Sequence, residues 1–180
     1  MLTQEIVPGI DLRLLERRHA IKLFDFIEKG RARFEDWIPF VSKTLTKEDT
    51  EKKIDSFLEL YKNGSGYFWG LWENDKIIGM ILIKDIDMCT KSAEIGCMID
   101  KDYEGRGIIK ESCMKMIKFL FEDLEINKII LCCDENNERS INIAKYFNFE
   151  HEGTLKQSIL INGKLRNTMH WALFKINDEK

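Results

Sequence analysis

The sequence predicts an α/β fold in which a mixed, mostly antiparallel sheet carries helices on both faces. Strand-like runs in the middle of the chain follow one another through short turns, which is typical of an antiparallel meander. Segments with apolar residues at helical spacing precede and follow these runs. One such segment joins two strand-like runs, and a helix in that position predicts one parallel crossover within the sheet.

The N-terminal half is expected to contribute one strand, two helices and the meander. Residues 10–16 alternate as a half-buried strand does, and apolar residues at helical spacing come next. Thr46 and Asp49 stand in a capping-box-like arrangement, and Asn63-Gly64 ends the helix that they open. In chain order the expected elements are a strand over 10–16, a helix around 20–27, a helix between 46 and 63, and strands over 67–73, 76–86 and 92–99.

The C-terminal half is expected to alternate helices with strands and to close on a hairpin. Apolar side chains from Ile109 to Leu124 recur along one helical face, which predicts a long amphipathic helix. Asn136-Asn137 opens a shorter helix, and Asn162-Gly163 is a turn between the closing strands. The expected elements are a helix over 109–124, a strand over 128–134, a helix through Phe147, and strands over 149–161 and 167–176. The resulting order is β-α-α-β-β-β-α-β-α-β-β, with seven strands.

Length and composition indicate a single domain over residues 1–180. A chain of 180 residues with 44% hydrophobic side chains can bury one full core. The formal net charge is only -3 with 33% charged residues, which argues against nucleic acid or an anionic membrane as the partner. No apolar run approaches the roughly 20 residues that a membrane span needs, and the first residues do not resemble a signal peptide. We therefore expect a cytoplasmic protein.

The cysteines and histidines do not predict a metal site or a disulfide framework. The cysteine count is odd, no C-x-x-C spacing occurs, and the three histidines, His19, His151 and His170, are scattered singly. We expect reduced, mostly buried thiols. Cys132 and Cys133 lie in a predicted buried strand without a sequence-adjacent base, so core packing is favoured over a role as covalent nucleophiles. The five cysteines are Cys89, Cys97, Cys113, Cys132 and Cys133.

A glycine-containing segment, DYEGRGIIKE at 102–111, stands where a predicted strand passes into a predicted helix. The start of a helix presents unpaired N–H groups and the positive end of the helix dipole. Gly105 and Gly107 leave room for an anion to reach these groups, so the segment is suited to a phosphate or pyrophosphate. A purely structural turn explains the glycines equally well. Arg106 either adds positive charge or stays solvated.

These residues and the order of elements resemble the GNAT acetyltransferases, and within them the RimJ/RimL-type N-acetyltransferases. Residues 104–109, EGRGII, resemble the family's Gln/Arg-x-x-Gly-x-Gly/Ala loop, with Glu104 and Ile109 as departures. AEIGCMI resembles the family's AEIGY strand, and the NERS segment at 137–140 resembles its Asn-x-x-Ser. YFNFEHEGTLK resembles the GFxxEGxL segment, with Asn148 in place of glycine. The resemblance covers nearly the whole chain and implies the GNAT fold.

The resemblance also implies the chemistry: direct transfer of an acetyl group from acetyl-CoA to a primary amine, without a metal. Ser140 would stabilise or protonate the departing thiolate, and Glu94 would take the proton of the amine. A helix cap for Ser140 and a solvated carboxylate for Glu94 are the alternatives. DWIPF, with Trp37 and Phe40, resembles the segment that lines the acceptor cleft. The residues implied to bind the coenzyme are Cys97, Met98, Ile99, Gly105, Arg106, Gly107, Ile108, Ile109, Asn137 and Ser140.

The acceptor stays open at this point. The N-terminal α-amine of a ribosomal or other protein is one candidate, and a polyamine, an amino acid or an aminoglycoside is another. Four aromatic residues either wall the acceptor cleft or belong to the core: Trp37, Phe40, Tyr67 and Trp69. Glu104, Ile159 and Asn167 depart from the family pattern and keep a non-catalytic acyl-CoA-binding module open as a second class of function. The sequence also leaves open whether the chain forms a homodimer.

Overall fold

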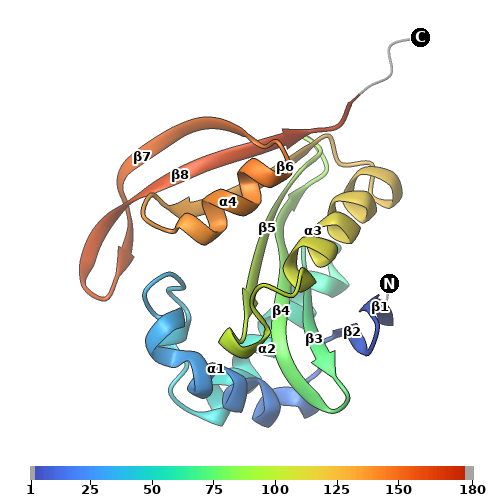
Figure 1. The fold of residues 1–180 in the computed structure, drawn as a ribbon, viewed down its shortest axis with the longest axis vertical. Coiled ribbons are helices and arrows are strands. Elements are labelled where there is room, and N and C mark those ends of the chain that lie inside the picture. Colours follow the sequence, from blue (N-terminus) through green and yellow to red (C-terminus); the bar gives the residue numbers. More distant parts are fainter. Residues whose placement is uncertain (1–2, 177–180) are drawn as a thin grey trace.

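The computed structural model describes residues 3–176, whose eight strands form one sheet with helices on both faces (Figure 1). The strand order is β1-β2-β3-β4-β5-β6-β8-β7, and only β5 and β6 pair in parallel among these neighbours. The predicted fold class is confirmed, including the parallel crossover between the third strand of the meander and the next strand. That residues 1–180 form a single domain stays a prediction.

The elements follow the predicted order. Those of the N-terminal half are β1 (Thr3–Val7), β2 (Ile10–Leu14), α1 (Ala20–Phe34), α2 (Lys47–Lys62), β3 (Tyr67–Glu73), β4 (Lys76–Asp87) and β5 (Ser92–Ile99). Those of the C-terminal half are α3 (Ile108–Lys118), a π-helical turn (Phe119–Asp123), β6 (Lys128–Asp134), α4 (Glu138–Tyr146), β7 (Glu150–Ile161) and β8 (Lys164–Phe174). Short 3-10 turns lie at Arg17–His19, Val41–Lys43 and Lys101–Tyr103.

The sheet has one strand more than predicted. The additional strand, β1, is five residues long and pairs only with β2 at the edge of the sheet. Ile6 is its only buried side chain, so the strand lacks the alternation that predicts a half-buried strand. A tight turn through Gly9, whose φ of 79° suits glycine, brings β1 beside β2.

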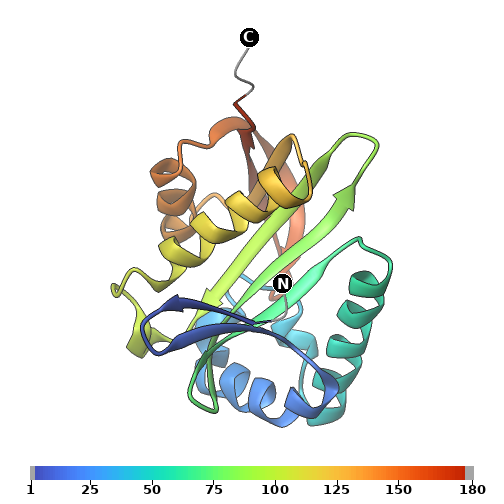
Figure 2. The ribbon, with the colours of Figure 1, turned by 90° about the vertical axis from the view of Figure 1, so that its right-hand side faces the viewer.

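Two hydrophobic cores lie on opposite faces of the sheet. The first core packs α3, the π-helical turn and α4 against it, through buried residues such as Met116, Leu120 and Ala144. The second core packs α1 and α2 against the other face, through residues such as Leu23 and Ile54. In Figure 2, the yellow helix α3 crosses in front of the green strands, whereas α1 and α2 lie together at the lower end. Within residues 3–176, no helix is long and apolar enough to cross a membrane.

Candidate active site

The sheet splits between β5 and β6. These two strands pair in parallel over only three positions, the last of which joins Glu94 to Ile130. Beyond this point β5 continues to Ile99 on β4 alone, and β6 continues to Asp134 on β8 alone. The facing edges of the two strands are therefore not joined to each other by ladder hydrogen bonds. An extended ligand that carries amide groups can pair with such edges as an added strand does.

Two helices begin at the open end of this split. Helix α3 starts at Ile108 after β5, and α4 starts at Glu138 after β6. The residue before α3 is Gly107, with φ of 77°. Because glycine has no side chain, no side chain of this residue caps the helix. A Cβ atom placed on Gly105 or Gly107 would meet nothing within 4 Å. The amide groups at the start of α3 are thus approachable, and with the helix dipole they form a site suited to an anion.

Asn137 is the residue that caps α4. Its Oδ1 accepts a hydrogen bond from the backbone N–H of Ser140 at 3.2 Å. The Ser140 hydroxyl forms no hydrogen bond with any other described residue, so the helix-cap alternative for Ser140 does not apply. This hydroxyl is available, half-buried, on the first turn of the helix that flanks the split.

A row of polar side chains crosses the sheet on the face opposite α3 and α4. Glu94 lies between Ala93 and Ile95, which both pack in the first core, so its side chain points to the face of α1 and α2. The same alternation and the strand pairing place three further side chains on this face: Lys84 on β4, Cys132 on β6 and His170 on β8. We call these three residues and Glu94 the polar row.

Contacts within the polar row join its members in pairs. Lys84 Nζ lies 2.7 Å from Glu94 Oε2, and the Glu94 side chain is only 19% exposed. The other carboxylate oxygen, Oε1, has no ion-pair or hydrogen-bond partner among residues 3–176. Cys132 Sγ lies 3.5 Å from His170 Nδ1. Glu94 therefore keeps one oxygen for an incoming donor, and His170, which the sequence did not single out, lies on the same face.

The surroundings of Cys132 disfavour its thiolate, although His170 lies beside the thiol. Burial, and next the negative charge of Glu94, raise the pKa of its thiol to about 12. A thiol attacks a thioester as the thiolate, which is scarce at neutral pH when the pKa is this high. The arrangement supports direct transfer to the amine over an acetyl-cysteine step, in agreement with the sequence-based interpretation.

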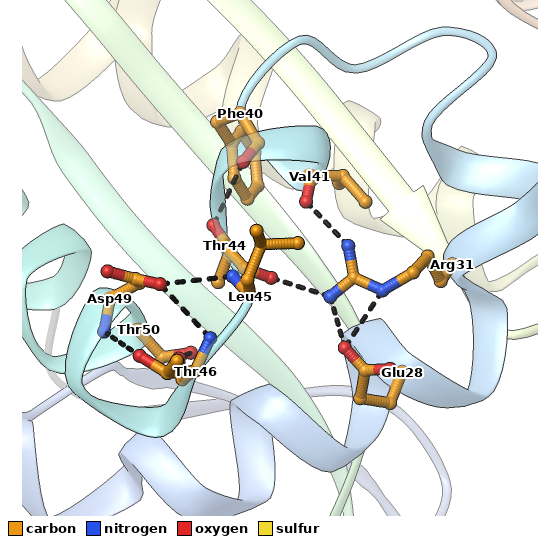
Figure 3. Close-up of polar contacts among 9 residues, drawn as sticks. All are labelled: Glu28, Arg31, Phe40, Val41, Thr44, Leu45, Thr46, Asp49 and Thr50. Atoms are coloured by element: carbon orange, nitrogen blue, oxygen red, sulfur yellow. Dashed lines mark hydrogen bonds and ion pairs between the residues drawn. The ribbon is translucent and has the colours of Figure 1, made fainter.

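The connection from α1 to α2 is held in place by polar contacts at both ends (Figure 3). Arg31 on α1 donates to the carbonyl oxygens of Val41 at 2.7 Å and Thr44 at 2.5 Å. At the start of α2, Asp49 Oδ2 accepts from the Thr46 N–H at 3.0 Å, and Thr46 Oγ1 accepts from the Asp49 N–H at 3.2 Å. The predicted capping box is confirmed. The segment that carries Trp37 and Phe40 is therefore well anchored.

Trp37 contacts the closing hairpin, and Phe40 packs toward α2. The Arg166 guanidinium on β8 lies 5.7 Å from the centre of the Trp37 ring, and its Nη1 lies 3.5 Å from Asp134 Oδ2 on β6. Phe40 packs against the second core, with Lys53 Nζ 5.2 Å from its ring centre. Both aromatic residues thus lie on the same side of the sheet as the polar row.

Tyr67 and Trp69 belong to the core. Their rings stack at 4.9 Å between centres, and both rings meet the edge of Phe119 in the first core. They lie on the opposite face of the sheet from the polar row. The core alternative holds for these two residues.

The predicted coenzyme residues line the two sides of the split. Cys97, Met98 and Ile99 occupy the last part of β5, but the Met98 side chain is buried in the second core, which leaves only its backbone for a ligand. Arg106 lies against its own loop, with Nη2 donating to the Asp102 carbonyl at 2.7 Å. Across residues 3–176, no group of three or more His, Cys, Asp or Glu side chains is placed to hold a metal ion.

Several charged residues of this region have no recognisable signal in the sequence. Lys53 and Arg166 sit in segments without a motif, and Arg139 occupies a variable position of the Asn-x-x-Ser segment. The ion-pair partners of Arg139 and Arg166 lie far away along the chain. Only the packing of the elements brings them to the split and the polar row.

The strand order, the split between β5 and β6 and the open helix start after β5 are consistent with the fold that the resemblance to the GNAT acetyltransferases implies. Residues 10–150 match the protein family described as "Acetyltransferase (GNAT) domain", and the chain belongs to this family. The predicted family and acyltransferase activity are confirmed.

The relatives that match the chain over most of its length include ribosomal-protein acetyltransferases. It is 30% identical to the putative ribosomal N-acetyltransferase YdaF of Bacillus subtilis, over 97% of this chain and 96% of that protein. It is 25% identical to the ribosomal-protein-serine acetyltransferase of Escherichia coli, over 89% of each chain. A solved structure of RimL, a ribosomal L7/L12 alpha-N-protein acetyltransferase in complex with coenzyme A, superposes with a TM-score of 0.90 at 20% identity, over 96% of this chain and 97% of that one.

Proposed function

We propose that this acetyltransferase takes acetyl-CoA as its donor and acetylates the N-terminal α-amine of a protein, with a ribosomal protein as the foremost candidate. The observation that carries the proposal is the split between β5 and β6, which has an open helix start at its mouth and the polar row on its acceptor side. The names of the relatives support the choice of acceptor. The five free cysteines suit the reducing cytoplasm, where we place the enzyme.

The residues of the split fit acetyl-CoA, which supplies a thioester activated for attack by an amine. The backbone of residues 97–99 would pair with the amide groups of the pantetheine arm. The amides that follow Gly107 would hold the pyrophosphate, because the space beside Gly105 and Gly107 is open.

Ser140 and Glu94 would act from opposite faces of the sheet. Ser140 belongs to α4, on the face of the first core, and Glu94 points to the face of α1 and α2. The Ser140 hydroxyl would donate to the sulfur that leaves, while the Glu94 carboxylate, directly or through water, would accept the proton of the amine. Lys84 would hold Glu94 Oε2 and leave Oε1 for this task.

Positive charge above the polar row supports a protein N-terminus over a polyamine as acceptor. Lys53 on α2 lies 5.2 and 4.8 Å from the ring centres of Phe40 and Phe57, and it forms no ion pair within the described chain. Burial lowers the pKa of Lys53, and the neighbouring charges of Lys84 and Lys43 lower it further. A polyamine would bring more positive charge to these lysines, whereas a peptide with an acidic side chain near its N-terminus would balance it.

The test is an acceptor panel followed by thiol release and mass spectrometry of the product. The panel contains peptides with acidic or basic residues at positions 2 to 4, spermidine and free amino acids. We expect Nα-acetylation, fastest on the acidic peptides, and a smaller preference for them in Lys53→Gln. Lys52→Gln is the matched control, because Lys52 is an exposed lysine on the same helix.

Two outcomes would contradict the proposal. Faster turnover of spermidine than of any peptide would move the enzyme to the small-molecule class. Tight binding of coenzyme A without thiol release on any acceptor would favour the non-catalytic binding module.

A further inference from the structure

Glu104 is the first residue of the glycine loop and departs from the family pattern. Its carboxylate contacts two arginines. Its Oε1 accepts a hydrogen bond from Arg33 on α1, and its Oε2 lies 3.2 Å from Arg139 Nη2 on α4. Glu104 follows β5 and Arg139 follows β6, the two strands that separate at the split. The Glu104–Arg139 ion pair therefore crosses the mouth of the split.

The two arginines are held very differently. Arg33 also donates to the carbonyl oxygen of Ile99, lies 4.6 Å from the ring centre of Phe34, and is 24% exposed. Arg139 is 64% exposed and has Glu104 as its only ion-pair partner among residues 3–176. An exposed ion pair of this kind contributes about 0–1 kcal/mol, so Arg139 can exchange partners at little cost while Arg33 stays fixed.

Glu104 also poses an electrostatic problem for the coenzyme. Its carboxylate stands three residues before Gly107, beside the helix start that is suited to an anion. A negative charge there repels phosphate groups unless it is neutralised. Arg33 alone provides one positive charge for this carboxylate, which leaves the Arg139 guanidinium as surplus positive charge at the mouth of the split.

We propose that the Glu104–Arg139 ion pair closes the mouth of the split in the free enzyme, and that Arg139 leaves Glu104 to bind the phosphate groups of the coenzyme when the coenzyme enters. Guanidinium groups bind phosphate oxygens through paired, charge-assisted hydrogen bonds, which are stronger than an exposed pair with a carboxylate. Glu104 then stays neutralised by Arg33. The proposal rests on the proposed function only in requiring that a coenzyme A derivative binds in the split, and it is independent of the acceptor.

The experiment measures binding without turnover, by calorimetric titration of the whole enzyme with coenzyme A and with pantetheine, which lacks phosphate groups. Arg139→Gln is expected to weaken binding of coenzyme A about fivefold to tenfold and to leave pantetheine unchanged. Lys145→Gln is the matched control, because it removes one exposed positive charge from the far end of the same helix. Thermal midpoints of both variants report whether the fold is intact.

A double substitution distinguishes contact of Arg139 with phosphate from neutralisation of Glu104 by Arg139. If Arg139 contacts phosphate, Glu104→Gln strengthens binding of coenzyme A about threefold, because it removes a repelling charge and frees Arg139. Adding Arg139→Gln to that variant then weakens binding at least as much as it does in the wild type, because no ion pair with Glu104 offsets the contact of Arg139 with phosphate. Equal affinities of the Glu104→Gln variant with and without Arg139 would overturn the proposal. So would equal effects of Arg139→Gln on coenzyme A and pantetheine. Failure of acetyl transfer with these binding results intact would count against the proposed function alone.

Discussion

Replacing Gly107 by alanine separates a binding role of the glycine loop from a purely structural turn. Gly107 has φ of 77°, where an alanine costs about 1 kcal/mol of stability because of its Cβ atom. In this chain length, that corresponds to a thermal midpoint lower by roughly 2–4 °C. The added Cβ would meet no protein atom within 4 Å, so no further loss of stability is expected.

The same Cβ would stand in the space from which an anion reaches the start of α3. We expect the affinity for coenzyme A to fall about tenfold, equivalent to about 1.4 kcal/mol. Gly9→Ala is the matched control, because Gly9 has φ of 79°, also has nothing within 4 Å of an added Cβ, and lies in the turn between β1 and β2. The assay is calorimetric titration with coenzyme A, together with thermal unfolding, on both variants.

The two variants should lose similar stability, and only Gly107→Ala should lose affinity. Equal affinities for the two variants would show that the loop does not bind the coenzyme. A much larger loss of stability in Gly107→Ala than in Gly9→Ala would show that the loop is mainly a structural turn.

Four further substitutions test the proposed chemistry and the cap of α4. Ser140→Ala should lower turnover with little change in thermal midpoint or coenzyme binding, and unchanged turnover would exclude the acid role. Asn137→Ala should instead cost about 1 kcal/mol of stability, because it removes the cap of α4. With an α-amine acceptor, Glu94→Gln should reduce kcat/KM mainly at low pH, because an amine with a reference pKa of about 7.7 to 8.0 deprotonates unaided at higher pH. If the kcat/KM profiles of wild type and Glu94→Gln superimpose from about pH 6 to 9, Glu94 has no part in the mechanism. Cys132→Ala should keep activity within about twofold, and loss of activity in this variant would restore the acetyl-cysteine step. At pH 8, Cys132 should be alkylated more slowly than the exposed Cys89. The reason is that the Cys132 pKa of about 12 leaves this thiol protonated until the pH rises toward that value.

Much of the fold followed from local patterns along the chain. The stripe from Ile109 to Leu124, the capping box at Thr46 and the turn at Asn162-Gly163 each involve residues close together in sequence, so periodicity and turn chemistry predict them. The predicted helix over 109–124 differs in one respect, because its α-helical part ends at Lys118 and a π-helical turn follows. The strand β1 escaped prediction because an edge strand with one buried residue carries almost no periodic signal. The glycine loop and its place before a helix were predicted for the same local reasons.

The sequence by itself determined the order of elements, the family and the open helix start at Gly107, because each depends on neighbouring residues or on a motif. The tertiary structure decided the rest of the site. Glu94 meets Lys84 only because β4 and β5 pair in one register, and Cys132 meets His170 only because β8 inserts between β6 and β7. Glu104 meets Arg139 across the mouth of the split because a helix follows each of the two diverging strands. Such pairs join residues distant in sequence, and only the order and register of the strands brings them together.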